Sequence, residues 1–442
     1  MKPRLVAFAF AVLVAAAATS GAPARADGLP PATAYDVRVS YKLLATSYYK
    51  PVRPAVLFAG ALAALAAVAH VRGIALALPD LRNAGEGAGL ARLESAIAAS
   101  ARRLHLTTKR ASYIAIAGMA RSVGDRYTQF FTPDDLKAFK DALDPEKISG
   151  IGVIVAPDTA SGYIQAAYVM PGTPADRAGL QGGDDIVSVD GISTKGMKQD
   201  DVTHVLRGRS GTIAHVLPAR AGKDLPMVAI VRAPVSPPTV VYRMLPGDVG
   251  YLAVFAFGQE TPDQFDAALD KVRAQGARSL VVDLRNNGGG YVDSAVRISQ
   301  LFIADKPIMT VEQRGLPDQT VRGYDAPVVD LPTAVLVNQY SASASEITAG
   351  ALQDDGVATL VGARTFGKGV MQDVTPLADG AAIKITIAHY LTPSNRDINL
   401  KGIVPDVVVD ENKNARFGDP ANDAQLRAAL AALQKKVALK GP

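Results

Sequence analysis

The stretch that decides the fold runs from residue 333 to residue 372 and reads TAVLVNQYSASASEITAGALQDDGVATLVGARTFGKGVMQ. Its apolar run at 334–337 predicts a buried strand, and a helical segment follows from about residue 344 to 353. A short polar turn between them places Ser341, Ser343 and Ser345 at the start of the helix. A sharp strand-to-helix turn lifts a side chain clear of the sheet, and the unpaired helix N–H groups favour developing negative charge. This is the layout that a serine nucleophile needs.

A lysine follows in the same stretch. After a second apolar run at 357–361 comes the loop Thr365-Phe366-Gly367-Lys368-Gly369. Because Lys368 lies between two glycines, the backbone can pack closely around it and remove water from its ammonium group. Desolvation lowers the pKa of a lysine below about 10.4 and allows it to act as a base.

A glycine-rich loop precedes both features. The apolar run at 279–284 predicts another buried strand, which leads into Arg285-Asn286-Asn287-Gly288-Gly289-Gly290. A backbone without side chains can present N–H groups to an oxyanion. If the strands are parallel, the three loops share the carboxyl edge of one sheet, where α/β proteins place their sites. We therefore expect serine, lysine and oxyanion donors to converge there, and we interpret Asp283 and Arg285 as a structural ion pair.

The choice of base depends on the histidines. The sequence contains five: His70, His105, His204, His215 and His389. Two lie in the N-terminal helices, two lie in a β-rich region, and the last is interpreted as structural. Lysine is therefore the natural base. No HExxH or other zinc-ligand spacing occurs, and we expect neither a metal nor a cofactor.

Each candidate also has a simpler interpretation. Ser343 alone would be a helix N-cap, with Glu346 completing a capping box, and Lys368 alone would be a surface lysine. The combination with Gln372 and the glycine triplet favours catalysis.

The motifs DLRNNGGG, SASASE and FGKG, in this order, resemble those of the carboxyl-terminal processing proteases. These enzymes, also called tail-specific proteases, are serine peptidases with a Ser/Lys dyad. The resemblance implies that Ser343 is the nucleophile and Lys368 the base, oriented by Gln372. It implies oxyanion donors in the backbone N–H groups of Ala344 and Gly289. The implied fold is multidomain α/β, with a mixed-sheet, crotonase-like (ββα) peptidase core.

Short strands and glycine turns between about 148 and 233 resemble a PDZ domain of the bacterial protease type, including PGTPADRAGL at 171–180. The loop and strand edge would hold a peptide carboxylate through backbone N–H groups while the peptide adds as an extra strand. The residues so implied are Gly150, Ile151, Gly152 and Val153. Arg207, in the motif LRG, is a candidate for reporting peptide occupancy to the catalytic site, although exposed arginines are more often solvated charges.

The partners that the resemblance implies are protein C-terminal tails. A homodimer and an activating adaptor are left open, with the N-terminal helices as one means of dimerisation. Net charge is +5, no run of five Lys or Arg occurs, and we assign no nucleic-acid partner. Cysteine is absent, which excludes disulfides, thiol catalysis and cysteine zinc sites.

Residues 27–147 are expected to be helical. The apolar run Ala55–Ala69 ends at His70 and Arg72 before it reaches the roughly 20 residues that a membrane span needs, so a buried helix is preferred. The segment GDRYTQFFTP at 124–133 resembles the Asp-Pro-Tyr-Thr segment of the family. Arg126 stands where proline is usual, and we expect this departure to affect no chemistry. The role of residues 36–105 is open.

The N-terminus predicts export. Lys2 and Arg4 precede an apolar run at 5–18, and Ala24-Arg25-Ala26 forms a small-x-small cleavage site. Roughly 14 apolar residues are too few for a span, so we prefer a cleaved signal peptide, residues 1–26, over an anchor. The mature chain is then periplasmic or otherwise extracytoplasmic, with no stable membrane span.

At 442 residues the chain can form several domains. We expect a helical region at 27–147, a PDZ domain at 148–233 and a peptidase domain with a C-terminal helix at 234–442. Two classes of function fit: a processing endopeptidase that works through an acyl-enzyme, and a PDZ-containing scaffold that binds tails without turnover. The intact Ser343, Lys368 and Gln372 favour the enzyme. A hydratase-like or ligand-binding use of the same sheet would not need the lysine.

Overall fold

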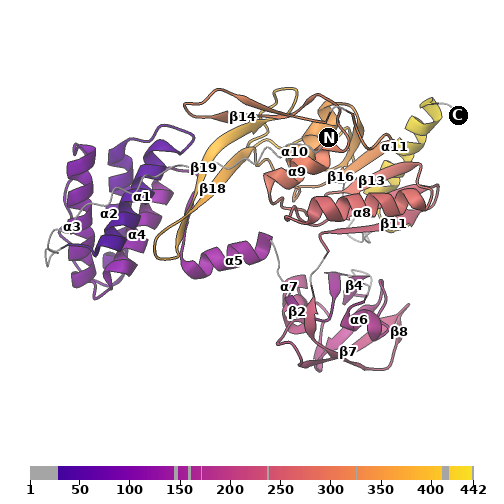
Figure 1. The fold of residues 1–442 in the computed structure, drawn as a ribbon. Helices are drawn as coiled ribbons and strands as arrows, with labels where there is room; N and C mark the ends of the chain where they lie inside the picture. Colours follow the sequence, from indigo (N-terminus) through magenta and orange to yellow (C-terminus); the bar gives the residue numbers. More distant parts are fainter. Residues whose placement is uncertain are drawn as a thin grey trace. The chain divides into compact units, whose positions relative to one another are not determined.

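The computed structural model describes residues 28–143, 148–157, 161–170, 172–235, 238–324, 326–410 and 418–440 (Figure 1). The predicted signal peptide lies outside these residues. Contacts among the described residues define two compact units, residues 28–41 with 54–122 and the described parts of residues 42–53 with 123–440. Residues 123–143, which the sequence analysis grouped with the N-terminal helices, therefore cluster with the second unit. The mixed α/β, multidomain class is confirmed.

The first unit is built from helices. They are α1 (Pro31–Thr46), whose last residues belong to the second unit, α2 (Pro54–Val71), α3 (Glu86–Arg103) and α4 (Thr108–Ser122). Helices α2 and α4 can approach closely because both carry a glycine at the contact. An ideal Cβ on Gly118 would lie 2.3 Å from the carbonyl oxygen of Gly60. The helices predicted from the sequence are confirmed.

Within the described residues, α2 is the helix that is long and apolar enough to cross a membrane. Its large side chains, including Leu57, Phe58 and Leu65, are buried, whereas its exposed positions are mostly alanine. This distribution suits a helix that packs in a small bundle. Length and composition do not separate a core helix from a span, so the preference for a core helix stays a prediction.

The β-rich part of the second unit begins after α5 (Pro133–Leu143). Its main sheet has the order β3-β4-β5-β7-β8, with β6 on β5 and β9 on β7, so that β3 is an edge strand. The strands are β3 (Val153–Pro157), β4 (Ile164–Val169), β5 (Asp185–Val189), β6 (Ile192–Ser193), β7 (Ile213–Arg220), β8 (Lys223–Asp224) and β9 (Val228–Val231). Two short helices, α6 (Pro174–Arg177) and α7 (Gln199–Leu206), and the strand pair β2 (Ile148–Gly150) with β10 (Ala233–Val235) complete it.

A six-stranded, mostly parallel sheet has the order β11-β12-β13-β16-β17-β20. Its strands are β11 (Val240–Leu245), β12 (Val249–Val254), β13 (Ser279–Asp283), β16 (Thr333–Val337), β17 (Ala358–Gly362) and β20 (Val407–Val408). From β12 to β20 the pairing is parallel, and only β11 is antiparallel. The loops after β13, β16 and β17 therefore leave the same edge, as predicted.

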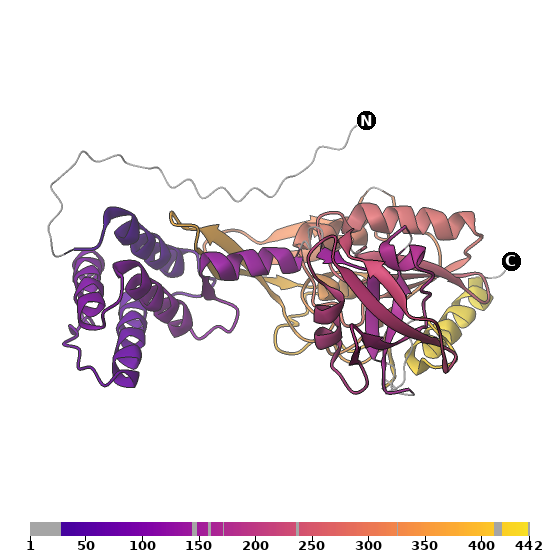
Figure 2. The ribbon, with the colours of Figure 1, turned by 90° about the horizontal axis from the view of Figure 1, so that it is seen from below.

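Alternate residues of this sheet enter two different cores. Leu252 and Val282 pack with α8 (Thr261–Ala274), α9 (Val292–Gln300) and α10 (Ala344–Asp354), whereas Tyr251 and Val281 pack with α11 (Ala424–Lys440). Figures 1 and 2 show α8 and α11 on opposite faces of the sheet. Since both faces are covered, the strands are apolar throughout, which explains the unbroken apolar runs in the sequence.

A five-stranded sheet lies beside this layer and carries the lysine loop at its margin. Its order is β1-β19-β14-β15, with β18 also paired to β19. The strands are β1 (Gln129–Phe131), β14 (Pro307–Gln313), β15 (Gln319–Arg322), β18 (Val370–Pro376) and β19 (Ala382–Leu391).

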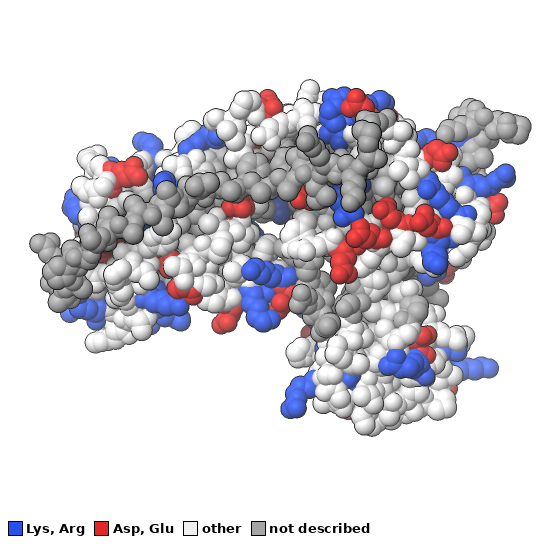
Figure 3. All heavy atoms as spheres, in the orientation of Figure 1, with Lys and Arg blue, Asp and Glu red and all other residues white. Residues whose placement is uncertain are grey.

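Figure 3 shows basic and acidic side chains interspersed over one face of the molecule.

Candidate active site

The turn between β16 and α10 places Ser343 at the carboxyl edge of the parallel sheet. Its backbone has φ +55° and ψ −114°, a conformation that a non-glycine residue adopts only when its surroundings impose it. Ser343 is the N-cap of α10, as its simpler interpretation predicted. The strained turn and the helix start together match the strand-to-helix elbow that exposes a nucleophile.

The three serines of this turn have different roles. The hydroxyl of Ser341 donates to the carbonyl oxygen of Leu284 at 2.8 Å, and that of Ser345 donates to the carbonyl oxygen of Asn287 at 2.8 Å. Both hydroxyls therefore connect the serine turn to the glycine-rich loop. Among the described residues, the hydroxyl of Ser343 donates to no acceptor, so it is the one hydroxyl of the three that is available for chemistry.

A buried carboxylate connects the serine turn to the lysine loop. Glu346, which is fully buried, accepts the N–H of Ser343 at 3.0 Å and the N–H of Lys368 at 2.8 Å on the same oxygen, Oε2. Its other oxygen accepts the N–H of Gly367 at 2.8 Å and the hydroxyl of Thr365. A carboxylate held by such donors inside a protein is strongly bound. Glu346 thus fixes the separation of the two loops.

Tyr390 on β19 makes a second connection. Its buried hydroxyl lies 2.6 Å from the carbonyl oxygen of Lys368 and 3.2 Å from that of Ser343. Burial raises the pKa of this phenol well above its ordinary value, so it stays protonated and can donate. The N–H groups of Ser343 and Lys368 therefore share one carboxylate oxygen, and their carbonyl groups share one hydroxyl.

Lys368 is partly buried in its loop, as expected from its flanking glycines, and its role as a base stays a prediction. Burial lowers the pKa of its ammonium from the ordinary value, against the opposing effect of Glu346 and Asp125. The flanking glycines allow this burial, because an ideal Cβ on Gly367 would lie 2.8 Å from the amide nitrogen of Gly402. The Lys368 Nζ lies 5.1 Å from the centroid of the Tyr127 ring. Within the described residues, no hydrogen bond joins it to the Ser343 hydroxyl.

Gln372 lies four residues further on, at a bulge in the pairing of β18 with β19. Its side-chain amide donates to the carbonyl oxygen of Val370 at 3.3 Å. Within the described residues it makes no hydrogen bond to Lys368, so its predicted orienting role stays a prediction.

The two predicted oxyanion donors differ. The N–H of Ala344, at the start of α10, has no acceptor among the described residues. The N–H of Gly289 instead donates to the side-chain oxygen of Asn287 at 2.9 Å. Gly289 nevertheless borders the serine turn, because an ideal Cβ there would lie 2.9 Å from the Ala344 nitrogen and 2.9 Å from the Ser343 Cβ. A side chain at this position would fill the space in front of the helix start.

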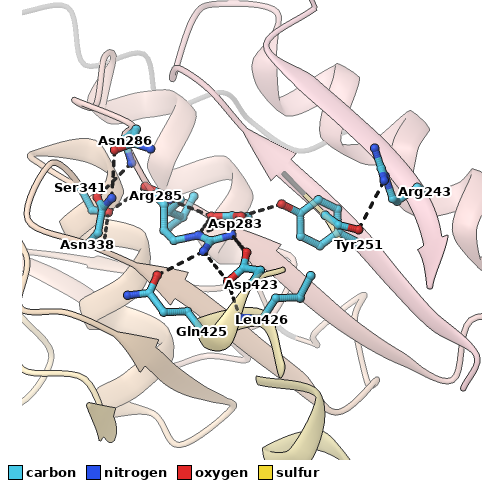
Figure 4. Close-up of polar contacts among 12 residues, drawn as sticks. Arg243, Tyr251, Asp283, Arg285, Asn286, Asn338, Ser341, Asp423, Gln425 and Leu426 are labelled. Atoms are coloured by element: carbon cyan, nitrogen blue, oxygen red, sulfur yellow. Dashed lines mark hydrogen bonds and ion pairs between the residues drawn. The ribbon is translucent and has the colours of Figure 1, made fainter. Parts of the chain in front are cut away.

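The glycine-rich loop is anchored by a buried ion network, shown in Figure 4. Arg285 pairs with Asp283 at 2.6 Å and with Asp423, at the start of α11, at 2.7 Å. It also donates to Gln425, while the Tyr251 hydroxyl donates to Asp283 at 2.6 Å. The predicted structural pair of Asp283 and Arg285 is confirmed. Because removing one partner would leave a buried charge, the network fixes where the loop begins.

The PDZ-like part contains a groove where the sequence places one. Its lining residues are Gly150, Ile151, Gly152, Val153, Val155, Met170, Thr203, Leu206, Arg207 and Val235. All five residues predicted to bind a peptide are therefore brought together. Strand β3 is at the edge of its sheet, so its outer side can accept a further strand.

Two other expectations have different outcomes. His389 packs against Tyr49 in a tilted arrangement with ring centroids 4.6 Å apart, and burial lowers its pKa, which agrees with a structural role. The expectation that Arg126 affects no chemistry stays a prediction, and its guanidinium lies 5.1 Å from the ring of Phe366 in the lysine loop.

The site and the fold agree with known relatives. Residues 248–409 match the profile of peptidase family S41, and residues 165–217 match that of the PDZ domain. The carboxyl-terminal-processing protease of a Picosynechococcus species is 34% identical over 341 residues, covering 76% of this chain and 82% of that protein. The carboxy-terminal processing protease CtpA of Bacillus subtilis is 32% identical over 336 residues, 73% of this chain and 72% of that protein.

A solved structure is similar as well. A Bacteroides fragilis protein described as an S41 protease matches with a TM-score of 0.52 at 19% identity, over 71% of this chain and 87% of that one. The protein is thus a serine-type peptidase with a PDZ domain. The chain belongs to peptidase family S41.

Sequence reasoning missed several contributors. Glu346 was recognised only as a capping-box partner, although its carboxylate also binds the lysine loop. Asp423 and Tyr390 were not singled out as parts of the site. The capping box was the one local signal for Glu346, whereas the bonds to Asp423 and Tyr390 join distant segments and leave no pattern in the sequence.

Replacing Glu346 by glutamine tests its role. The amide keeps the shape of the side chain but turns a donor toward backbone N–H groups that need acceptors. We expect kcat/KM to fall at least about a hundredfold and the free energy of unfolding to fall by about 3 kcal/mol. Peptidase assays and denaturant unfolding measure both. Glu260→Gln, at an exposed glutamate at the start of α8, is the matched control, and wild-type kcat/KM in Glu346→Gln would contradict the role.

Proposed function

We propose that this S41 peptidase is an exported endopeptidase that binds protein C-terminal tails in its PDZ groove and cuts them with a Ser343/Lys368 dyad. The observation that carries the proposal is the joint anchoring of Ser343 and Lys368 to Glu346 and Tyr390. Such anchoring fixes the separation of the two backbone positions that carry the nucleophile and the base, so that only side-chain movement is needed for proton transfer between them.

In the proposed reaction, neutral Lys368 takes the proton of the Ser343 hydroxyl, and the oxygen attacks the carbonyl carbon of the scissile peptide bond. The negative oxygen that forms accepts hydrogen bonds from the N–H groups of Ala344 and Gly289. The C–N bond then breaks, and the lysine ammonium gives its proton to the leaving amine. Water, deprotonated by Lys368, hydrolyses the acyl-enzyme and restores Ser343.

Two adjustments precede this step. The Lys368 ammonium must move from the ring of Tyr127 toward Ser343, and the N–H of Gly289 must leave the side chain of Asn287. Gln372 is proposed to orient the lysine once it has moved. Both adjustments require only side-chain rotation or a local backbone change, because Glu346 holds the backbone of the lysine loop and the hydroxyls of Ser341 and Ser345 hold the glycine-rich loop.

The dyad predicts a defined pH dependence. A base must be neutral, so the rate should rise with pH as Lys368 loses its proton, and the midpoint should lie below the ordinary lysine pKa of 10.5 because burial favours the neutral form. Cleavage of an unfolded reporter with an apolar tail should be abolished in Ser343→Ala and Lys368→Ala. Ser394→Ala and Lys401→Ala, at exposed positions, are the matched controls. Turnover by either active-site variant would refute the dyad.

Tail recognition predicts a requirement for a free carboxylate. The backbone N–H groups at the start of β3 would bind a terminal carboxylate but not an amide of the same sequence. Binding of the tail peptide to Ser343→Ala should weaken at least about tenfold when the terminus is amidated. Calorimetry measures this without turnover, and an internal copy of the same sequence serves as a second control. Equal affinity of the free and amidated peptides would exclude carboxylate capture and leave Arg207 without a sensor role.

Export rests on the N-terminal pattern of two cations, an apolar run and Ala24-Arg25-Ala26. Removal of the signal peptide would leave a chain that begins at Asp27. Intact-mass analysis of the protein from an extracytoplasmic fraction should give that mass. The mass of the full 442-residue chain, found only in the cytoplasm, would contradict export.

A further inference from the structure

Tyr127 contacts two cations beside the lysine loop. The Lys368 ammonium lies 5.1 Å from the centroid of its ring, and the Arg126 guanidinium lies 4.8 Å from the same centroid. Arg126 also donates a hydrogen bond of 2.6 Å to the Tyr127 hydroxyl. An aromatic face attracts cations that have lost part of their water, so one ring holds the base and a permanent positive charge close together.

Arg126 also contacts the lysine loop directly. Its guanidinium lies 5.1 Å from the centroid of Phe366, whose side chain is 44% exposed and so is not fixed by the core. The N–H of Phe366 donates to the carbonyl oxygen of Ser341 at 3.0 Å. The contact of the guanidinium with this ring therefore restrains the loop between the serine turn and Lys368.

The segment that carries Arg126 is itself fixed. Asp125 accepts the N–H of Tyr127 at 3.0 Å and the hydroxyl of Thr128 at 2.8 Å, and it also accepts the hydroxyl of Thr386 on β19. Directly after this segment, β1 pairs with β19. The guanidinium of Arg126 thus reaches the lysine loop from a segment whose backbone is held by hydrogen bonds and strand pairing.

We propose that Arg126 is a positioning residue of the peptidase, which holds the loop of Lys368 through Phe366 and Tyr127 and keeps a fixed positive charge beside the base. This inference rests on the proposed function, because it assigns Arg126 a role only if Lys368 is the base. It gives the segment before the PDZ domain a direct part in arranging the site.

Charged groups face Lys368 from several elements. Burial, the largest effect, and Arg126 lower its pKa, whereas Glu346 on α10 and Asp125 raise it. Removing Arg126 would leave both carboxylates and so raise the pKa of Lys368. The proton would then be lost at higher pH, and the rising limb of activity would move in the alkaline direction.

The remaining neighbours do not replace this charge. Lys384 on β19 lies over the rings of Phe131 and Phe139, at 5.2 and 5.1 Å. Burial, followed by the charge of Lys368, lowers its pKa to about 8, so it is partly neutral in the range where the base works. Tyr127 stays neutral because burial raises its pKa. Arg126 is the neighbour that remains a cation at every working pH.

The test compares Arg126→Gln, Arg126→Lys and Phe366→Leu in the full chain, with Arg121→Gln at an exposed arginine of α4 as the control. We expect Arg126→Gln to lower kcat/KM at pH 7 by about three- to tenfold and to move the rising limb by about half a pH unit to higher pH. Arg126→Lys should restore the rising limb but only part of the rate, because an ammonium keeps the charge but lacks the guanidinium that contacts Phe366 and Tyr127. Phe366→Leu should lower the rate without moving the limb.

Ser343→Ala and Lys368→Ala, assayed in parallel, separate the two levels of inference. If both are inactive while Arg126→Gln keeps the wild-type rate and limb, the role of Arg126 is refuted and the dyad stands. If Lys368→Ala remains active, both the dyad and the role of Arg126 are refuted. If Arg126→Gln and Arg126→Lys lose the same rate and neither moves the rising limb of the pH profile, the role of the charge is refuted. Thermal unfolding of each variant shows that activity is compared between folded proteins.

Discussion

The site depends on one buried carboxylate. Glu346 accepts four donors from two loops, and the N–H groups of Ser343 and Lys368 share a single oxygen. An isolated carboxylate in a protein interior is costly, and only such a set of donors stabilises it. The two loops therefore cannot separate, because Glu346 would then lose its hydrogen-bond donors. A local helix cap has thereby become the connection between Ser343 and Lys368.

The parallel sheet makes this connection possible. Strands β13, β16 and β17 end at one edge, and the loops that follow them bind one another through backbone groups and buried hydroxyls. The C-terminal helix α11 contributes from the opposite face, because Asp423 at its start pairs with Arg285. Residues at the end of the chain thus help to set the loop that borders Ser343.

The arrangement of the charges explains how a lysine could serve as a base. Burial and Arg126 favour the neutral form of Lys368, while Glu346 and Asp125 favour the charged form. Burial is the largest of these effects, so the pKa of Lys368 is lowered, and the two carboxylates limit the shift. In this structure the ammonium rests on Tyr127 and the N–H of Gly289 rests on Asn287. The backbone of the loops is therefore held in place, whereas the Lys368 ammonium and the Gly289 N–H are paired with groups other than Ser343.

The sequence by itself determined the buried strands, the serine turn and the glycine-flanked lysine, because apolar runs, turn residues and glycines act over a few neighbouring positions. It also indicated the capping box of Glu346. The parallel pairing of the strands comes from the structure, and the PDZ-like groove was implied by resemblance to a known family. Only the tertiary structure decided what these parts contact. The bond from Glu346 to Lys368 spans 22 residues and that from Arg285 to Asp423 spans 138, and Arg126 meets Phe366 across the fold. Such pairs are set by how the sheets and loops pack in space, which no local pattern records.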